Sequence, residues 1–155
     1  MMIDIPTDVD DNNTKEIEAY FNLFKEILPM GNWRVILELV NSHDLSHYIK
    51  SPDAYGACNK NRNTMYATIY INEDKPRVDE YGETWEFTLL HEMLHLVIDD
   101  FMEYIEMKSP EIQEDTFFQI KKERLINLLS YSFFAALTTN INEQEVDSLA
   151  EVNRF

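Results

Sequence analysis

Apolar side chains recur at two different spacings in the first half of this 155-residue chain. In the segment 14–28 they return every three or four positions, which predicts a helix with one buried face. In 33–40 apolar and polar residues alternate, which predicts a strand. The segment 55–72 has strand-like runs on either side of the asparagine-rich turn 59–63, and it predicts a hairpin. We therefore expect a helix followed by a small, mostly antiparallel sheet.

Two longer apolar segments follow a charged loop, and both predict helices. In the segment 87–98 most residues are apolar and lie on every side of a helix, which is typical of a buried helix. Ser109 and Pro110 end this helix and begin the next, because serine favours the N-cap and proline the first turn. The next helix is expected over 110–137, and a short acidic helix over 143–152 closes the chain.

The order of these elements predicts an α+β fold with an N-terminal helix, a small sheet or hairpin and two long helices. Hydrophobic residues make up 45% of the chain, which is enough for one compact core. No linker, repeat or low-complexity tract divides the sequence. We therefore expect a single domain over residues 13–155, preceded by an acidic arm over residues 1–12 that need not be ordered.

The chain is strongly acidic, with 13 Lys and Arg residues against 29 Asp and Glu residues and a formal net charge of -16. Such a chain repels phosphate groups, so we expect neither nucleic acid nor a membrane as a partner. Cys58 is the single cysteine, which excludes an internal disulfide framework. The start does not resemble a secretory signal, and no apolar run approaches the roughly 20 residues that span a bilayer. We expect a cytoplasmic or otherwise intracellular protein.

The buried helix contains one motif with direct chemical meaning, His91-Glu92-Met93-Leu94-His95. Residues four apart on a helix lie about 40° apart around its axis and about 6 Å apart along it, so both imidazoles can reach one metal ion. Glu92 then stands over a metal-bound water as a general base. Buried histidine and glutamate side chains need hydrogen bonds or a metal ion, and the alternative that these histidines are only structural stays open.

A catalytic zinc ion usually has three protein ligands and one position for water, so a third ligand is needed. Acidic residues further along the same helix are out of reach, since Asp99 lies about 12 Å along the axis from His91. The next helix is a better source if it packs antiparallel to the first. Ser109, at the turn, stands midway along the chain between His95 and Glu123. Glu123 therefore returns level with the histidines, although an exposed glutamate paired with its basic neighbours is the alternative.

His43 and His47 form a second histidine pair with the same spacing along the chain. The sequence around them predicts a turn-rich link, and no glutamate follows the first histidine. We therefore expect a solvated or capping role for this pair rather than a second metal site.

The motif with a glutamate on the following helix resembles the gluzincin branch of the zinc metallopeptidases. The short core around the motif and the small size of the chain resemble minimal, minigluzincin-type domains, including small ones from microbial and viral genomes. The resemblance covers about residues 55–137 and implies a zincin-like domain with one Zn²⁺ ion per chain, held by His91, His95 and Glu123. Asn127 stands where thermolysin-like members have an aspartate that orients a ligand histidine, and it can accept the same hydrogen bond.

The resemblance also implies a zinc metallopeptidase, and an endopeptidase in particular. Such an enzyme hydrolyses a peptide or protein substrate with metal-activated water and Glu92 as the general base. In zincins the substrate lies extended along an edge strand, which we expect here around Ala67, Thr68 and Ile69. Tyr131 is a candidate for the additional donor that stabilises the oxyanion.

The main alternative is a non-catalytic or latent zincin-like module that binds a peptide or protein partner. An intact Glu92 argues against a pure binding module, because binding needs no general base. A latent enzyme would be held off by a prosegment, by the C-terminal tail or by a Cys58 thiolate on zinc, although a small strand residue is the simpler role for Cys58. A metal-dependent ribonuclease is set aside, because Glu92 replaces its glycine and Asp100-Phe101 replace its third histidine.

Overall fold

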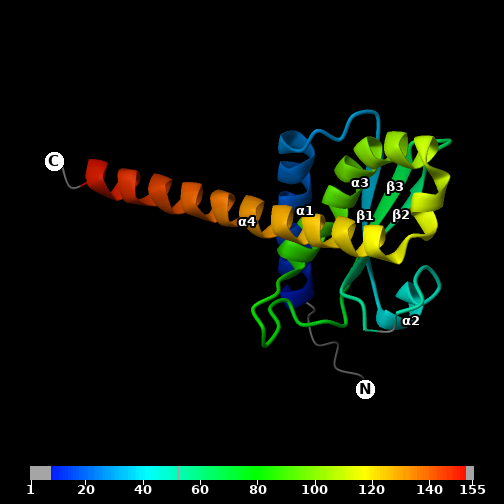
Figure 1. Ribbon diagram of the computed structural model, residues 1–155. Coiled ribbons are helices and arrows are strands. Elements are labelled where there is room, and N and C mark those ends of the chain that lie inside the picture. Colours follow the sequence, from blue (N-terminus) through cyan, green and yellow to red (C-terminus); the bar gives the residue numbers. More distant parts are fainter. Residues whose placement is uncertain (1–7, 52, 153–155) are drawn as a thin grey trace, which may run out of the picture.

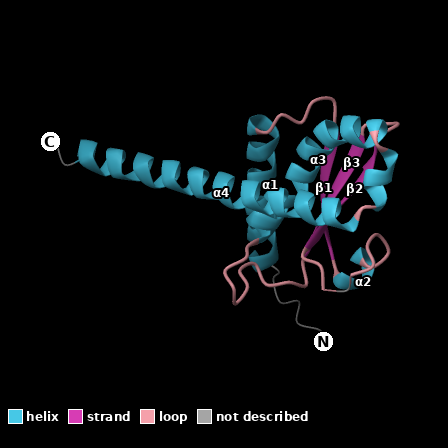
Figure 2. Cartoon of the chain, in the orientation of Figure 1, coloured by secondary structure: helices cyan, strands magenta, loops and turns pink. Residues whose placement is uncertain are grey.

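The computed structural model describes the backbone of residues 8–51 and 53–152 and the side chains of residues 12–51 and 53–139. The fold is α+β, as expected (Figures 1 and 2). In chain order its elements are α1 (Asp8–Ile27), β1 (Arg34–Val40), α2 (Ser42–Leu45), β2 (Gly56–Asn61), β3 (Tyr66–Asn72), α3 (Trp85–Lys108), the 3₁₀ helix η1 (Pro110–Glu114) and α4 (Thr116–Val152).

The described strands form one three-stranded sheet in the order β1-β3-β2. β2 pairs antiparallel with β3, which confirms the predicted hairpin, although its turn lies at 62–65 rather than 59–63. β1 pairs with β3 in parallel. The sheet is therefore mixed rather than mostly antiparallel, because the chain between β1 and β3 is long enough to return to the same end of the sheet.

The central position of β3 overturns the predicted substrate strand. Ala67, Thr68 and Ile69 each have a partner in β1 and another in β2. Their backbone groups face neighbouring strands on both sides, so no edge remains for an added strand. The β-branched and aromatic residues of β3 predicted a strand correctly, but residue types alone do not tell a central strand from an edge strand.

α1 and α3 cover one face of the sheet, and α3 also packs against α4 on its other side (Figure 1). The core between these layers contains fully buried apolar residues from all of them: Ile17, Phe24, Ile69, Ile71, Leu89, Leu90, Met93, Leu96 and Ile126. The opposite face of the sheet carries a smaller cluster under α2, made by Leu45, Ala57 and Tyr70. The layered arrangement explains why α3 is apolar on every side.

The boundaries of α3 follow local capping rules. The Thr84 side chain accepts a hydrogen bond from the Phe87 backbone N–H at 3.1 Å and begins the helix. Ser109 ends it as the C-cap. Pro110 begins η1 rather than α4, so the predicted start of the second long helix is wrong, and α4 begins at Thr116.

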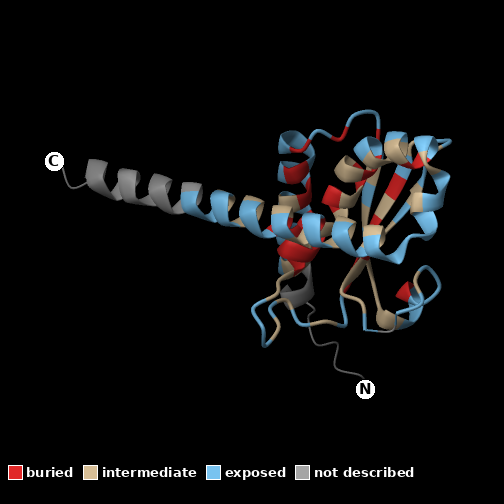
Figure 3. Ribbon diagram, in the orientation of Figure 1, coloured by how far each residue is buried: buried red, intermediate tan, exposed pale blue. Residues whose placement is uncertain are grey.

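Both ends of the chain are more helical than expected. Residues 8–12, which the sequence assigned to the acidic arm, form the first turns of α1, and residues 1–7 lie outside the described part. The segment 143–152 is no separate helix but the continuation of α4, which has 37 residues and extends away from the body of the protein (Figure 1). Up to residue 139, where side chains are described, much of this extension is exposed (Figure 3). Within the described residues, no helix is long and apolar enough to cross a membrane.

Candidate metal centre

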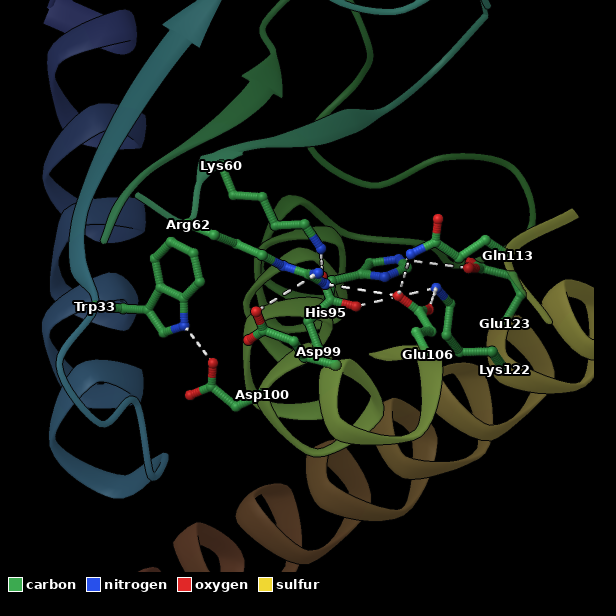
Figure 4. Close-up of polar contacts among 11 residues, drawn as sticks. Trp33, Lys60, Arg62, His95, Asp99, Asp100, Glu106, Gln113, Lys122 and Glu123 are labelled. Carbon is green, nitrogen blue, oxygen red and sulfur yellow. Dashed lines mark hydrogen bonds and ion pairs between the residues drawn. The ribbon is translucent and has the colours of Figure 1, made fainter. Parts of the chain in front are cut away.

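The structure brings His91, His95 and Glu123 together. The two histidines lie four residues apart on one face of α3, and Glu123 comes from α4, which packs against α3. Figure 4 shows His95 and Glu123. Nε2 of His91 lies 2.9 Å from one carboxylate oxygen of Glu123, and Nε2 of His95 lies 3.4 Å from the other. The three side chains come from different turns and helices, so the cluster exists only because α3 and α4 are paired.

The ligand atoms of these three residues lie close enough together to share one metal ion. The candidate ligand atoms of the three residues all lie within 4.8 Å of one another. Zinc binds nitrogen and carboxylate oxygen at about 2.0–2.2 Å, which places neighbouring ligand atoms of a tetrahedral site about 3.3–3.5 Å apart. Two imidazoles and one carboxylate leave a fourth position for water or substrate, and this donor set suits Zn²⁺.

Burial strongly perturbs the pKa values of Glu92 and His95. Burial, with the Glu123 carboxylate adding to it, raises the pKa of Glu92 to about 8. Burial, the neighbouring His91 and the cations Lys60 and Lys122 lower the pKa of His95 to about 3. His95 is therefore a neutral imidazole near pH 7, which is the form that binds metal. A carboxyl group with a raised pKa beside a histidine with a lowered pKa is typical of a functional site.

Strand β2 lies directly against α3 beside Glu92, and Gly56 makes this approach possible. A Cβ atom at Gly56 would lie 2.7 Å from Thr88 Cγ2, 2.7 Å from the Tyr70 backbone oxygen and 3.5 Å from Glu92 Cγ. Real Cβ atoms do not come so close to backbone oxygen, so a larger residue would push β2 away from α3. Glycine thus holds an edge strand beside the candidate general base.

A cavity of about 170 Å³ lies between β2 and α4 over the first turns of α3. Its lining includes His91, Glu92, Tyr55, Phe87, Thr88 and Asn127. The cavity therefore has both polar and aromatic walls and reaches one histidine of the cluster together with the candidate base. It is a suitable place for one side chain of an extended peptide.

Asn127 and Tyr131, the candidates for orienting a histidine and for stabilising the oxyanion, lie in different surroundings. Asn127 lines the cavity next to His91, although no hydrogen bond joins its side chain to either histidine among the described contacts. The Tyr131 ring packs against the Phe87 ring with centroids 4.7 Å apart, and Tyr131 remains 59% exposed. The packing role of Tyr131 is thus visible, while its role as an oxyanion donor stays a prediction.

Cys58 lies on β2 and packs against the main core. Burial, with the Glu92 carboxylate adding to it, raises the pKa of the Cys58 thiol to about 12. A thiol with this pKa is protonated near pH 7 and is a poor metal ligand. These surroundings favour the small strand residue over the thiolate plug. The C-terminal segment, the other candidate inhibitor within the described chain, continues α4 away from the metal centre (Figure 1).

The second histidine pair also forms a cluster, but in a different environment. His43, Asp44 and His47 have candidate ligand atoms within 4.8 Å of one another, and all three residues are exposed. The capping role at α2 belongs to Asn41, whose side chain accepts a hydrogen bond from the Asp44 backbone N–H at 2.8 Å. Exposure on a one-turn helix agrees with the solvated role expected for the two histidines.

Sequence reasoning missed a group of charged side chains beside the metal centre. Asp99 and Glu106 are buried on α3, and they pair with Lys60 from β2, with Arg62 from the turn that follows β2, and with Lys122 from α4 (Figure 4). Asp99 was excluded as a ligand because of its distance, but its place one turn after His95 on the same face was a signal that it lies near the site. The basic partners come from distant segments and carry no such signal.

No family model, curated protein or solved structure matches this chain.

Proposed function

We propose that this protein is a zinc-dependent metallopeptidase of the gluzincin type, with a small zincin-like fold. The observation that carries the proposal is the convergence of His91, His95 and Glu123 from two helices, with Glu92 beside them and a cavity next to them. Structural histidines would need hydrogen-bond partners only. Hydrogen bonding alone would explain Glu123 beside one imidazole, but it gives no reason for two imidazoles at the same carboxylate with a buried glutamate of raised pKa beside them.

Each residue of the cluster has a defined task in this reaction. His91, His95 and Glu123 would hold one Zn²⁺ ion, which acidifies water and polarises a carbonyl group when it is bound. Glu92 in its carboxylate form accepts a proton from the water that attacks the peptide carbonyl carbon. With a pKa of about 8 this form is the minor one near pH 7 in the metal-free protein, so the base works best toward higher pH. When the C–N bond breaks, Glu92 returns this proton to the leaving nitrogen, so that the products are a carboxylate and an amine.

β2 replaces β3 as the strand that would hold the substrate. It is an edge strand of the described sheet, and Gly56 places it against Thr88 and Glu92. An extended peptide that adds to the free edge of β2 would form main-chain hydrogen bonds and present a side chain to the cavity over α3. The proposal thus keeps strand addition but moves it to a different strand.

The proposal is tested by metal content and proteolysis together. Purified protein is analysed for zinc, and cleavage of an unfolded casein-like substrate is followed for the wild type, Glu92→Gln and Glu123→Ala. We expect one tightly bound zinc ion per chain that survives Glu92→Gln and is lost or weakened in Glu123→Ala. We expect cleavage by the wild type only. The same measurements are made on the double variant His43→Ala, His47→Ala, so that zinc bound at the surface histidines is not included in the zinc content per chain.

Two results would contradict the proposal in different ways. If the wild-type protein binds no zinc, or binds zinc equally well in Glu123→Ala, His91 and His95 have only a structural role. A zinc protein whose residual cleavage is equal in the wild type and Glu92→Gln would be a binding module rather than a peptidase, since the cleavage would then come from a contaminant.

A further inference from the structure

The first two turns of α4, which carry Glu123, contribute no residue to the main hydrophobic core within the described chain. The residues of α4 that pack against the main core begin at Ile126 and continue with Leu129, Phe133, Phe134 and Leu137. Before that point, Phe117 is 68% and Ile120 is 46% exposed. The side chain of Glu123 is itself 47% exposed. Some other interaction must therefore fix the start of α4 against α3.

Ion pairs join the start of α4 to α3. The Lys122 ammonium lies 4.0 Å from a carboxylate oxygen of Asp99 and 3.9 Å from one of Glu106, both on α3. The side chains of Asp99 and Glu106 are only 2% and 8% exposed. The two acids are two helical turns apart, so they share one face of α3 with the metal-binding histidines.

The same two acids also anchor β2. Lys60 forms an ion pair with Asp99, and an Arg62 nitrogen lies 3.9 Å from a Glu106 carboxylate oxygen (Figure 4). The Gln113 side chain of η1 donates a hydrogen bond to Glu106 at 3.4 Å. Asp99 and Glu106 thus tie β2, η1 and α4 to α3 at one end of the metal centre.

We propose that Lys122 is a positioning residue for the metal centre, which fixes Glu123 opposite His91 and His95 by its ion pairs with Asp99 and Glu106. This inference rests on the proposed function, because it assumes that Glu123 is a metal ligand. Lys122 directly precedes Glu123 in the helix, so a shift of one backbone position moves the other. Partners that orient metal ligands set metal affinity as well as geometry.

The direction of the change in zinc affinity separates a positioning role of Lys122 from a simple effect of its charge. Removal of a positive charge near a divalent cation site lowers repulsion and, by itself, tightens metal binding. A positioning role predicts the opposite change, because α4 loses its attachment and Glu123 is no longer held in place. The two explanations therefore differ in the direction of the change in zinc affinity.

The test measures zinc affinity by competition with a chromophoric chelator, in a background with His43→Ala and His47→Ala. We expect Lys122→Met to bind zinc about 10- to 100-fold more weakly than the background protein. Lys122→Arg keeps the charge and the two partners and should restore most of the affinity. Lys121→Met is the matched control, since Lys121 is exposed on the same helix and contacts the Phe117 ring, with no carboxylate partner among the described ion pairs. It should stay within about twofold of the background protein, as for most exposed surface changes.

A second variant covers the case in which Lys122→Met unfolds because a buried acid loses its partner. Lys122→Met combined with Glu106→Gln removes one charge of each sign and keeps the network balanced. It should fold, as judged by circular dichroism, and still bind zinc at least about tenfold more weakly than the background protein.

A double-mutant cycle shows whether Lys122 acts through Glu123. In a Glu123→Ala background, Lys122→Met should no longer weaken zinc binding, because the group that it positions is gone and only the loss of charge repulsion remains. Equal or tighter zinc binding by folded Lys122→Met, or the same loss with and without Glu123, overturns the positioning role and leaves the metal centre intact. Absence of a Glu123-dependent zinc site in the background protein overturns the proposed function, and the positioning role fails with it.

Discussion

The protein contains two histidine pairs with the same spacing, and their surroundings differ in almost every respect. His91 and His95 lie within a 24-residue helix covered by the sheet and by α4, and a carboxylate from another helix completes their cluster. His43 and His47 lie at a short helix on the surface. Both clusters bring three ligand atoms within 4.8 Å of one another.

The difference shows that spacing along a helix determines which side chains can lie together. Burial then determines whether their pKa values and surroundings suit a functional site. The inner cluster has a base with a raised pKa, a neighbouring edge strand and a cavity. The outer cluster has ligands that are exposed to water. An exposed pair of imidazoles gains little from any particular geometry, so the outer cluster has no preorganised site to offer a substrate.

The largest expected effect is loss of catalysis in Glu92→Gln. Removal of a general base typically lowers the rate by about 10²- to 10⁴-fold, so peptide cleavage should fall by that amount while zinc remains bound. Activity and zinc content measured on the same samples check this outcome. Full activity in Glu92→Gln would remove the main chemical distinction between the two clusters.

The next largest effect concerns stabilisation by zinc. At a free zinc concentration of about 100 times the dissociation constant, binding to the folded state adds about 2.7 kcal/mol to the free energy of unfolding. Thermal unfolding with and without zinc should show this gain in the wild type and in the double variant His43→Ala, His47→Ala. The gain should disappear in His91→Ala, and a gain that persists there would place the zinc elsewhere.

Gly56→Ala should weaken the inner cluster without touching a ligand. The added methyl group would lie against the Tyr70 backbone oxygen and Thr88, so β2 must move away from α3. Overpacking of this kind costs about 1–3 kcal/mol of unfolding free energy, which chemical denaturation measures.

Gly82→Ala is not a fair control, because Gly82 has a φ of +82° and would be strained in any case. Exposed Ala135→Gly is a better reference for a one-methyl change on a helix. An unchanged free energy of unfolding in Gly56→Ala would contradict the close approach of β2 to α3.

The smallest effect is expected at the outer cluster. His43→Ala with His47→Ala should change the free energy of unfolding by about 0.5 kcal/mol or less, because both side chains are exposed. Peptide cleavage should be unchanged. A large loss of activity in this variant would show that the outer cluster takes part in function after all.

Several features of the fold were predictable because they depend on local spacing. The hairpin of β2 and β3 follows from strand-like residues on either side of a turn rich in asparagine, and the buried helix α3 follows from apolar residues on all its sides. The level of Glu123 with the histidines followed from the position of Ser109 midway between His95 and Glu123 in the sequence. That argument worked although α4 begins later than expected, since η1 also returns the chain toward α3.

Other features depend on contacts between distant segments and had no local signature. The sequence does not show that β1 joins β3 in parallel and leaves β2 at the edge, because strand order is decided by which surfaces pack together. The partners of Asp99 and Glu106 come from β2 and α4, so their ion pairs appear only in the folded protein. The prediction of a helix end between 137 and 143 was wrong, and no glycine or proline in that segment interrupts α4.

The sequence by itself determined the chemical groups of this protein: two imidazoles and a glutamate at helical spacing, and a second glutamate at the right distance along the chain. These follow from backbone geometry, which repeats in every helix. Only the tertiary structure decided which strand lies beside the base, which acids are buried beside the histidines and which lysine holds the start of α4. Those outcomes depend on the packing of layers, where the burial of a charge requires a partner from wherever the fold can supply one.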